Sequence, residues 1–287
     1  MKTLSVRIAQ INPTLGNLHA NLELHLREIE AAKAAGAQVL VFPELSLTGY
    51  FLKDQTAELA TDLEQPELQR LIGLSGDLSI VVGFVERDRG GSLFNSCAWL
   101  ERGEVRHVHR KVHLVSYGMF DEQRDFAAGH RFQSFESRWG RFGILTCEDA
   151  WHMPGPYTYF LDEVDGIVVP SAGPGRGVAS ADEPGLRSTA TWDRLLCNWA
   201  MLTQSFVVYA NRVGFEDGIA FGGGSVVHGP EGRVVSRLEG LDPGVLDARL
   251  DGAELRRARI AVPLRRDERP WNLADELARR DTSGGRR

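Results

Sequence analysis

The sequence predicts a mixed α/β fold. Its N-terminal part contains a strand–helix–strand unit, which is typical of α/β layers. Short apolar runs bounded by turn residues recur along the rest of the chain and indicate buried strands. No internal repeat or linker divides the sequence, so we expect one domain over residues 1–287, with a charged tail from about residue 253.

The first unit shows the two periodicities on which this prediction depends. Residues 4–11 alternate apolar and polar side chains, as a strand does. In residues 18–34 apolar side chains recur at helical spacing with charged ones outside them, which predicts an amphipathic helix. Gly36 suits the end of that helix, because glycine readily adopts a left-handed conformation. The apolar run at 39–43 predicts the second strand.

The later elements follow the same patterns. Residues 116–129, rich in acidic and aromatic side chains, are predicted as a long loop or short helix, and residues 171–186 as a loop rich in small residues. Helices are expected at 66–74, 157–165 and 186–203, and strands at 78–86, 94–101, 105–111, 132–135, 142–146, 166–170, 205–211, 225–238 (a hairpin) and 245–250.

Composition and charge exclude several classes of function. The chain is 43% hydrophobic and 25% charged, as globular proteins are. A net charge of −6 argues against nucleic acid or an anionic membrane as a main partner. Three cysteines favour a reducing compartment over a disulfide framework. Without a signal peptide or a membrane-length apolar run, a cytoplasmic location is expected.

Three reactive side chains each close a predicted strand. Cys147 ends the apolar run that begins at Phe142, Glu44 follows the run at 39–43, and Lys111 ends the strand at 105–111. An isolated cysteine in such a place would more often be a buried structural residue. A thiol, a carboxylate and an ammonium at three strand ends instead suggest a nucleophile with its base and its cation.

The residues around these strand ends resemble a known family. Residues 42–45 (FPEL), 110–114 (RKVHL) and 146–149 (TCED) are similar to the three signature segments of the nitrilase superfamily of carbon–nitrogen hydrolases, in the same order and with comparable spacing. The resemblance extends from the first strand to about Arg249. It implies a four-layer α-β-β-α sandwich of two mixed sheets, often extended across a dimer, and a Glu-Lys-Cys triad.

The chemistry of these three groups suits amide hydrolysis. A thiolate attacks the amide carbon, and a neighbouring cation such as Lys111 lowers the pKa of the thiol. The same ammonium and a backbone N–H beside Cys147 stabilise the oxyanion. Glu44 acts as general base and acid. The alternative for Glu44 and Lys111 is a structural salt bridge. No cofactor is required.

A second glutamate is implied by the resemblance. Family members often carry one after the lysine motif and before a glycine, and Glu122 occupies that place in residues 120–129. We assign it an auxiliary role in orienting Lys111 or the substrate. The alternative is a solvated charge in a loop.

One branch of the superfamily is more similar than the others. Residues 47–50, 116–122 and 147–151 look like the glutaminase domain of glutamine-dependent NAD synthetases. This resemblance implies that Tyr117 and Glu148 lie beside the substrate amino acid, with Phe120 nearby. The branch usually has serine where this chain has Gly173, which puts glutamine in doubt. Arg176, in a loop expected to close over the site, is a candidate partner for a substrate carboxylate.

The histidines near Lys111 allow a metal site as an alternative. His107, His109 and His113 fall on one predicted strand face together with Lys111, and three histidines can bind zinc. We reject a metal because the lysine ammonium would repel a divalent ion.

The expected function is hydrolysis of a small linear carboxamide to a carboxylate and ammonia. One alternative is a glutaminase subunit that delivers ammonia to a separate NAD synthetase. Another is an inactive binding or regulatory homologue that keeps the fold. Besides the small-molecule amide, the resemblance implies a homodimer or higher homo-oligomer.

Overall fold

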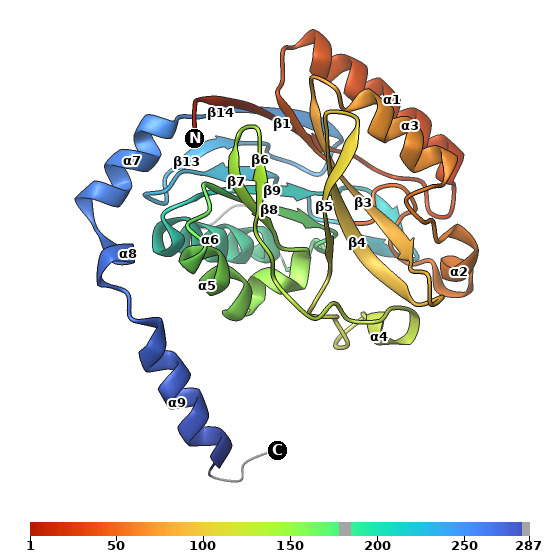
Figure 1. Ribbon diagram of the computed structural model, residues 1–287. Helices are drawn as coiled ribbons and strands as arrows, with labels where there is room; N and C mark the ends of the chain where they lie inside the picture. Colours follow the sequence, from red (N-terminus) through yellow and green to blue (C-terminus); the bar gives the residue numbers. More distant parts are fainter. Residues whose placement is uncertain (178–184, 283–287) are drawn as a thin grey trace.

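The chain folds as a four-layer sandwich in which two six-stranded sheets pack face to face and helices cover their outer faces (Figure 1). The computed structural model describes residues 1–177 and 185–282. Neighbouring strands are parallel in the middle of each sheet and antiparallel towards its edges. The predicted α-β-β-α sandwich of two mixed sheets is confirmed.

Each sheet has its own spatial order of strands, from one edge to the other. The first sheet contains β14 (Gly244–Leu250), β1 (Leu4–Gln10), β2 (Val39–Val41), β3 (Ser79–Arg87), β4 (Leu93–Glu101) and β5 (Glu104–Arg110). The second contains β13 (Val234–Arg237), β12 (Val226–His228), β9 (Phe206–Asn211), β8 (Gly166–Ser171), β7 (Gly140–Ile144) and β6 (Phe135–Ser137). A separate hairpin pairs β10 (Phe215–Glu216) with β11 (Ile219–Ala220).

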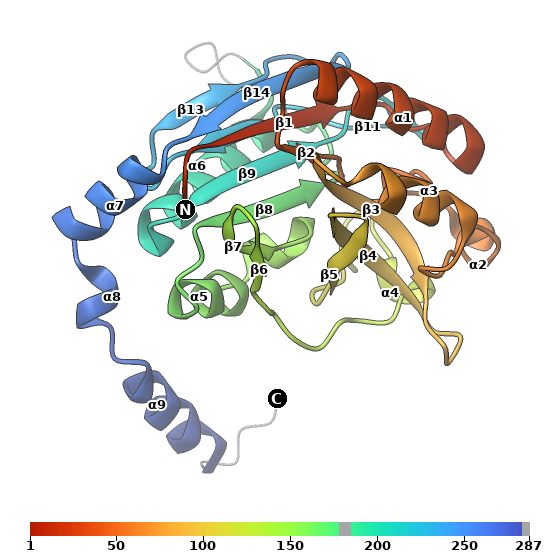
Figure 2. The ribbon, with the colours of Figure 1, turned by 45° about the horizontal axis from the view of Figure 1, so that its top comes forward.

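The helices fall into three groups. The outer layers are α1 (Leu18–Ala34) and α3 (Pro66–Leu74) on the first sheet and α5 (Pro154–Leu161) and α6 (Arg187–Thr203) on the second. Loops contain η1 (Lys53–Gln55), α2 (Thr56–Leu59), α4 (Glu122–Asp125) and η2 (Cys147–Trp151). After the last strand come α7 (Gly252–Ala261), α8 (Leu264–Asp267) and α9 (Pro270–Thr282), and α9 stands away from the sheets (Figures 1 and 2). None of the described helices is long and apolar enough to cross a membrane.

The sheet interiors explain why the strands appear as continuous apolar runs. In β8, Val168 faces the core between the two sheets, whereas Ile167 and Val169 face the core beneath α6. All three side chains are at most 2% exposed. Because both faces of these central strands are buried, both need apolar side chains.

Some predicted boundaries are wrong. The strand expected at 132–135 is β6 at Phe135–Ser137, because the ring of Phe132 packs with the helix-side core instead. The helix expected at 157–165 is α5, which begins at Pro154, and proline at the first helical turn has no N–H to lose. The charged tail includes a regular helix, α7, whose first turn is capped by the side chain of Asp251.

Parallel strands bring the reactive residues to one region. Glu44 lies just beyond β2, and Cys147 and Ser171 lie at the corresponding ends of β7 and β8. A glycine fixes the path of the first of these loops. A Cβ atom on Gly83 of β3 would lie 2.4 Å from the backbone nitrogen of Leu45, so only glycine lets the loop carrying Glu44 cross directly over the strand.

Candidate active site

Glu44 lies at the centre of a buried polar network. Its side chain is 1% exposed. Oε1 accepts a hydrogen bond of 2.7 Å from Asn95 Nδ2, and Oε2 accepts one of 2.8 Å from the backbone N–H of Ala172. Burial raises the pKa of Glu44, and Glu122 raises it further, while Lys111 opposes both. A carboxylate whose pKa lies above its ordinary value is a better proton acceptor.

Lys111 follows β5 and joins two carboxylates. Its Nζ atom lies 2.7 Å from Oε1 of Glu44 and 2.7 Å from Oε1 of Glu122, and its side chain is fully buried. Burial by itself lowers the pKa of Lys111, but the two glutamates hold it well above the ordinary value. The lysine is therefore an ammonium ion, and its charge is offset by two buried acids.

Glu122 contacts the ammonium of Lys111 and is not among the described residues that line the cavity below. Its Oε1 also accepts a short hydrogen bond of 2.5 Å from the hydroxyl of Tyr50, and its Oε2 accepts one of 2.9 Å from the backbone N–H of Val115. Of the alternatives open from the sequence, this geometry favours contact with the ammonium over a solvated loop charge, because the side chain is 4% exposed.

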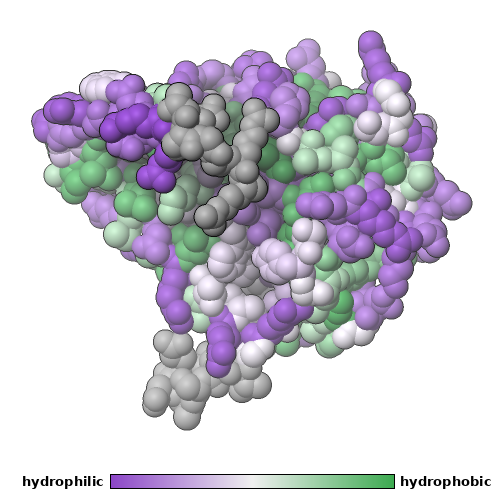
Figure 3. Space-filling model, turned by 90° about the horizontal axis from the view of Figure 1, so that it is seen from below, coloured by the Kyte–Doolittle hydropathy of each residue, from purple (hydrophilic) through white to green (hydrophobic). Residues whose placement is uncertain are grey.

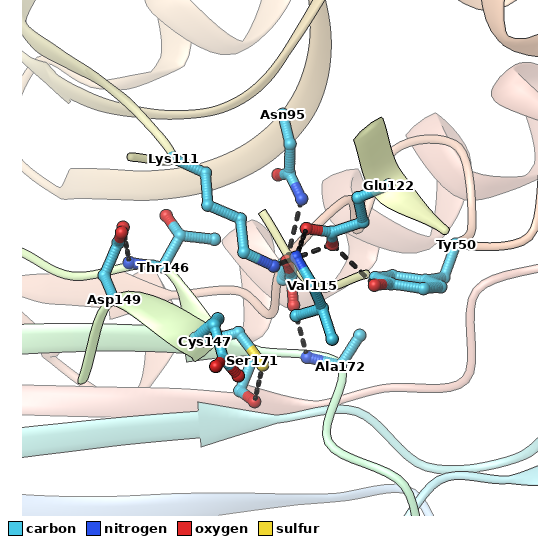
Figure 4. A network of polar contacts seen from close by, with 12 residues as sticks. Tyr50, Asn95, Lys111, Val115, Glu122, Thr146, Cys147, Asp149, Ser171 and Ala172 are labelled. Atoms are coloured by element: carbon cyan, nitrogen blue, oxygen red, sulfur yellow. Dashed lines mark hydrogen bonds and ion pairs between the residues drawn. The ribbon is translucent and has the colours of Figure 1, made fainter. Parts of the chain in front are cut away.

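Cys147 is the first residue of η2, where the chain turns sharply after β7. Its φ of 45° lies in the left-handed region, which is uncommon for a residue with a side chain and recurs at functional sites. The hydroxyl of Ser171 donates to Sγ over 3.2 Å (Figure 4). Burial and the charge of Glu44 raise the pKa of the thiol, while Lys111 and Ser171 lower it. The cation expected to produce a thiolate is thus outweighed, and the thiol needs a base to lose its proton.

A cavity of about 410 Å³ opens above the thiol. Glu148 lies in its wall, where Oε2 accepts a hydrogen bond of 3.0 Å from Tyr117 Oη and Oε1 lies 3.4 Å from Nε2 of His152. The described lining residues are mostly aromatic or small, with two arginines: Tyr50, Val115, Tyr117, Phe120, Cys147, Glu148, Trp151, Gly173, Pro174, Arg176, Gly177, Arg187, Ser188, Thr191 and Trp192.

All four residues proposed as substrate contacts therefore line one cavity. Arg176 is exposed, and its guanidinium lies about 3.7 Å from where a Cβ on Gly118 would be. Residues 178–184 of the loop expected to close over the site lie outside the described residues, so closure stays a prediction. Gly173 is closely packed, since a Cβ there would lie 3.1 Å from both Trp192 Nε1 and Tyr209 Oη.

The histidines serve structural contacts. His109 Nε2 and His113 Nδ1 lie 2.8 and 3.3 Å from the carboxylate of Asp149, and His107 stacks on Phe135 at a ring separation of 4.6 Å. The predicted shared strand face is wrong for Lys111 and His113, because β5 ends at Arg110. Within the described part of the chain, no group of three or more His, Cys, Asp or Glu side chains is arranged to hold a metal ion.

Sequence reasoning missed several residues that touch this network. Asn95, in the middle of β4, hydrogen-bonds Glu44 and shows no local motif that would mark it. Ser171 could have been found, because it ends the strand next to the one that leads to Cys147, and the ends of neighbouring parallel strands meet. Tyr50 follows the Glu44 loop in sequence, but its bond to Glu122 needed the structure.

Comparison with known proteins identifies the family of this chain. The family model described as carbon-nitrogen hydrolase matches residues 5–260. This chain belongs to the carbon–nitrogen hydrolase family. Membership accounts for the occurrence of the three signature segments together.

Relatives of this carbon–nitrogen hydrolase include two kinds of enzyme. It is 31% identical over 274 residues to a glutamine-dependent NAD(+) synthetase of Thermotoga maritima, covering 93% of this chain and 45% of the relative. A solved glutamine-dependent NAD+ synthetase of Acinetobacter baumannii superposes with a TM-score of 0.78 at 29% identity, covering 88% of this chain and 47% of that one. The chain thus spans about half the length of these relatives. The solved structure of an amidase of Nesterenkonia sp. AN1, with acrylamide added to its active site cysteine, superposes with a TM-score of 0.76 at 25% identity. The match covers 90% of this chain and 97% of that one.

Proposed function

We propose that this protein hydrolyses a small linear carboxamide to a carboxylate and ammonia through a thioester on Cys147. The observation that carries the proposal is the proximity of three groups: the Glu44 carboxylate lies 2.7 Å from the Lys111 ammonium, both act on the pKa of the Cys147 thiol, and Cys147 lines the cavity. A carboxamide is a weak electrophile, and a covalent intermediate divides its hydrolysis into two easier steps.

In the first step Glu44 accepts the thiol proton as Sγ attacks the amide carbon. The Sγ–C bond forms and the carbonyl electrons move to oxygen, where the Lys111 ammonium and the N–H after Cys147 stabilise the oxyanion. Glu44 returns the proton to the nitrogen, the C–N bond breaks, and ammonia leaves. The pKa values of Glu44 and Cys147 are both raised. A Glu44 carboxylate with a raised pKa is a better acceptor for the thiol proton.

In the second step water replaces ammonia. Glu44 takes a proton from the water, whose oxygen attacks the thioester carbon, and the same groups again stabilise the oxyanion. The C–Sγ bond then breaks, the carboxylic acid leaves, and the proton returns to the sulfur. Asn95 and the N–H of Ala172 keep the Glu44 carboxylate in place for both transfers.

The reaction class is tested by a screen for released ammonia with small amides, nitriles and N-carbamoyl compounds. We expect turnover of short amides and trapping of an acyl group on Cys147 by mass spectrometry of acid-quenched enzyme. Good turnover of nitriles without amide hydrolysis would replace the proposed substrate class. The absence of turnover on every compound would favour a binding or regulatory homologue.

A second candidate function is a glutaminase that supplies ammonia to a separate synthetase. Similarity to NAD synthetases over about half of their length, together with Glu148 and Tyr117 in the cavity wall, favours it. Gly173 argues for a related amide instead, because the close approach of Trp192 and Tyr209 leaves little room for a serine side chain there. Glutamine in the same ammonia assay, beside acetamide and propionamide, separates the two candidates.

We expect Glu148→Gln to raise KM for amino-acid amides more than for simple aliphatic amides. Glu148 bears a charge in the cavity wall next to the thiol, so it suits a substrate amine. Loss of one hydrogen bond to a charged group costs roughly 1.5–3 kcal/mol, or on the order of tenfold to a hundredfold in kcat/KM. The measurement is steady-state kinetics on both amide types, with Tyr117→Phe as the matched variant that removes only the neighbouring hydroxyl. Equal losses on both types would assign Glu148 a structural or catalytic role.

We also propose that two copies of this chain associate. A groove of about 810 Å³ lies between α5, α6 and the C-terminal helices, and large apolar side chains that line it are exposed, among them Met153 (75%), Leu202 (56%) and Leu277 (58%). Figure 3 shows hydrophobic surface between hydrophilic patches on one face of the molecule. One chain offers both a groove and an amphipathic helix, α9, and a twofold axis pairs such surfaces reciprocally.

Light scattering at micromolar concentration is expected to give the mass of at least a dimer. Leu277→Glu should shift that mass towards the monomer, because it places a charge in the apolar contact. Glu276→Gln, on the neighbouring position of the same helix, is the control. A monomer mass for the unmodified protein would remove the proposal.

A further inference from the structure

Asp149 is a buried carboxylate that the reaction scheme does not use. It is fully buried, with 0% of its surface exposed, and it is not among the described residues that line the cavity. Its hydrogen bonds go to backbone N–H groups and to histidine rings, and none of those described reaches the thiol of Cys147 or the ammonium of Lys111. Its hydrogen bonds nevertheless reach both loops that carry the thiol and the ammonium.

One oxygen of Asp149 binds the loop of Lys111. Oδ1 accepts hydrogen bonds from the backbone N–H groups of Val112 (3.0 Å) and His113 (2.9 Å), the two residues that follow the lysine. The ring nitrogen Nδ1 of His113 lies 3.3 Å from the same oxygen. This half of the carboxylate thus fixes the backbone directly beyond Lys111.

The other oxygen binds the loop of Cys147. Oδ2 accepts a hydrogen bond of 3.1 Å from the backbone N–H of Thr146, the residue before the cysteine (Figure 4). It also lies 2.8 Å from Nε2 of His109, a buried residue of β5. Burial raises the pKa of Asp149, but the hydrogen bonds from His109 and His113 hold it well below its ordinary value. Asp149 is therefore an ionised carboxylate, and both of its oxygens accept hydrogen bonds.

We propose that Asp149 is a positioning residue that sets the separation between Lys111 and Cys147. The two come from different sheets, since Lys111 follows β5 of the first and Cys147 follows β7 of the second. Apolar packing between sheets is non-directional and does not by itself fix their relative position. Hydrogen bonds to an ionised acceptor are short and directional. The inference rests on the roles proposed for the lysine and the cysteine.

Asp149→Asn tests this inference with almost no change in volume. An amide has one oxygen, so one of the two loops must face an NH₂ group in place of an acceptor. We expect kcat to fall about a hundredfold, as small misplacements of catalytic groups do, with KM changed by less than about threefold. The rate at which iodoacetamide alkylates Cys147, followed by mass spectrometry, should fall about tenfold or more, because the thiol loses its placement beside the base Glu44 that accepts its proton and beside the cation Lys111.

Two variants of His109 keep the test usable if Asp149→Asn does not fold. His109→Gln retains a donor for Oδ2 and should keep most of the activity, whereas His109→Leu removes the donor and should lower kcat about tenfold. One pair of results would overturn this inference and leave the proposed function standing. In it, wild-type Cys147 reacts with iodoacetamide faster than Cys197, and Asp149→Asn changes neither that rate nor kcat. The inference is also overturned if the two His109 variants behave alike. A wild-type Cys147 that reacts no faster than Cys197 would overturn the proposed function and this inference with it.

Discussion

Replacing Cys147 by alanine should abolish turnover. Sγ of Cys147 is the one protein atom that forms a covalent bond to the substrate in the proposed scheme. No second thiol lines the described cavity. Removal of an enzymatic nucleophile costs on the order of 10⁵–10⁶-fold in kcat. The measurement is ammonia release from the best amide found in the screen, with circular dichroism to show that the variant is folded. Substrate binding, measured by calorimetry, should survive.

Cys197 and a chelator provide the controls for that experiment. Cys197→Ala removes a thiol whose Sγ lies 3.2 Å from the backbone oxygen of Gly232, on α6 and away from the cavity, and should leave activity within about twofold, as surface substitutions usually do. A chelator should leave activity intact. Activity that persists in Cys147→Ala but disappears on chelation would restore the histidine metal site as an interpretation.

Replacing Lys111 by methionine should remove both activity and stability. Among the described residues, the Lys111 ammonium is the only cation that contacts both Glu44 and Glu122. Lys111→Met therefore leaves two neighbouring buried carboxylates without a compensating positive charge. Breaking a buried ion pair on one side costs about 3–5 kcal/mol. Loss of one oxyanion-stabilising group costs about 10²–10³-fold in kcat. Chemical denaturation and steady-state kinetics measure the two effects separately.

A double variant separates the structural from the catalytic role of Lys111. Adding Glu122→Gln to Lys111→Met removes one of the two uncompensated charges and should restore about half of the lost free energy of unfolding. Activity should stay at the level of the single variant. Recovery of activity along with stability would show that Lys111 serves the fold alone. Lys53→Met, at an exposed pair with Asp217, is expected to cost less than about 1 kcal/mol.

The sequence alone was sufficient for the parts of the fold that local patterns encode. Helical spacing located α1 at Leu18–Ala34, with the C-terminal glycine Gly36 at a positive φ of 71°. Apolar runs located the central strands, because strands buried on both faces carry mostly apolar side chains. The three signature segments placed a carboxylate, an ammonium and a thiol at strand ends, and in the structure Glu44 contacts Lys111 and both affect the pKa of Cys147.

Local patterns failed where distant contacts decide. The apolar pattern at Phe132 predicts a strand, but this residue packs beneath the helices, and nothing next to it in sequence indicates that. The proximity of Lys111 predicts a lowered pKa for Cys147, yet burial and Glu44 raise it. Desolvation depends on everything that surrounds a group, and no sequence window contains that information.

What the sequence determined by itself was the inventory of reactive groups and the strands that carry them. Only the tertiary structure decided how those groups meet. Asn95 on β4 bonds Glu44 beyond β2 of the same sheet, and Ser171 on β8 bonds Cys147 beyond the neighbouring strand β7. Asp149 on η2 contacts His109 of the other sheet, which requires the two sheets to pack face to face. A hydrogen bond requires its two atoms to lie within about 3 Å, and that proximity is a property of the folded chain.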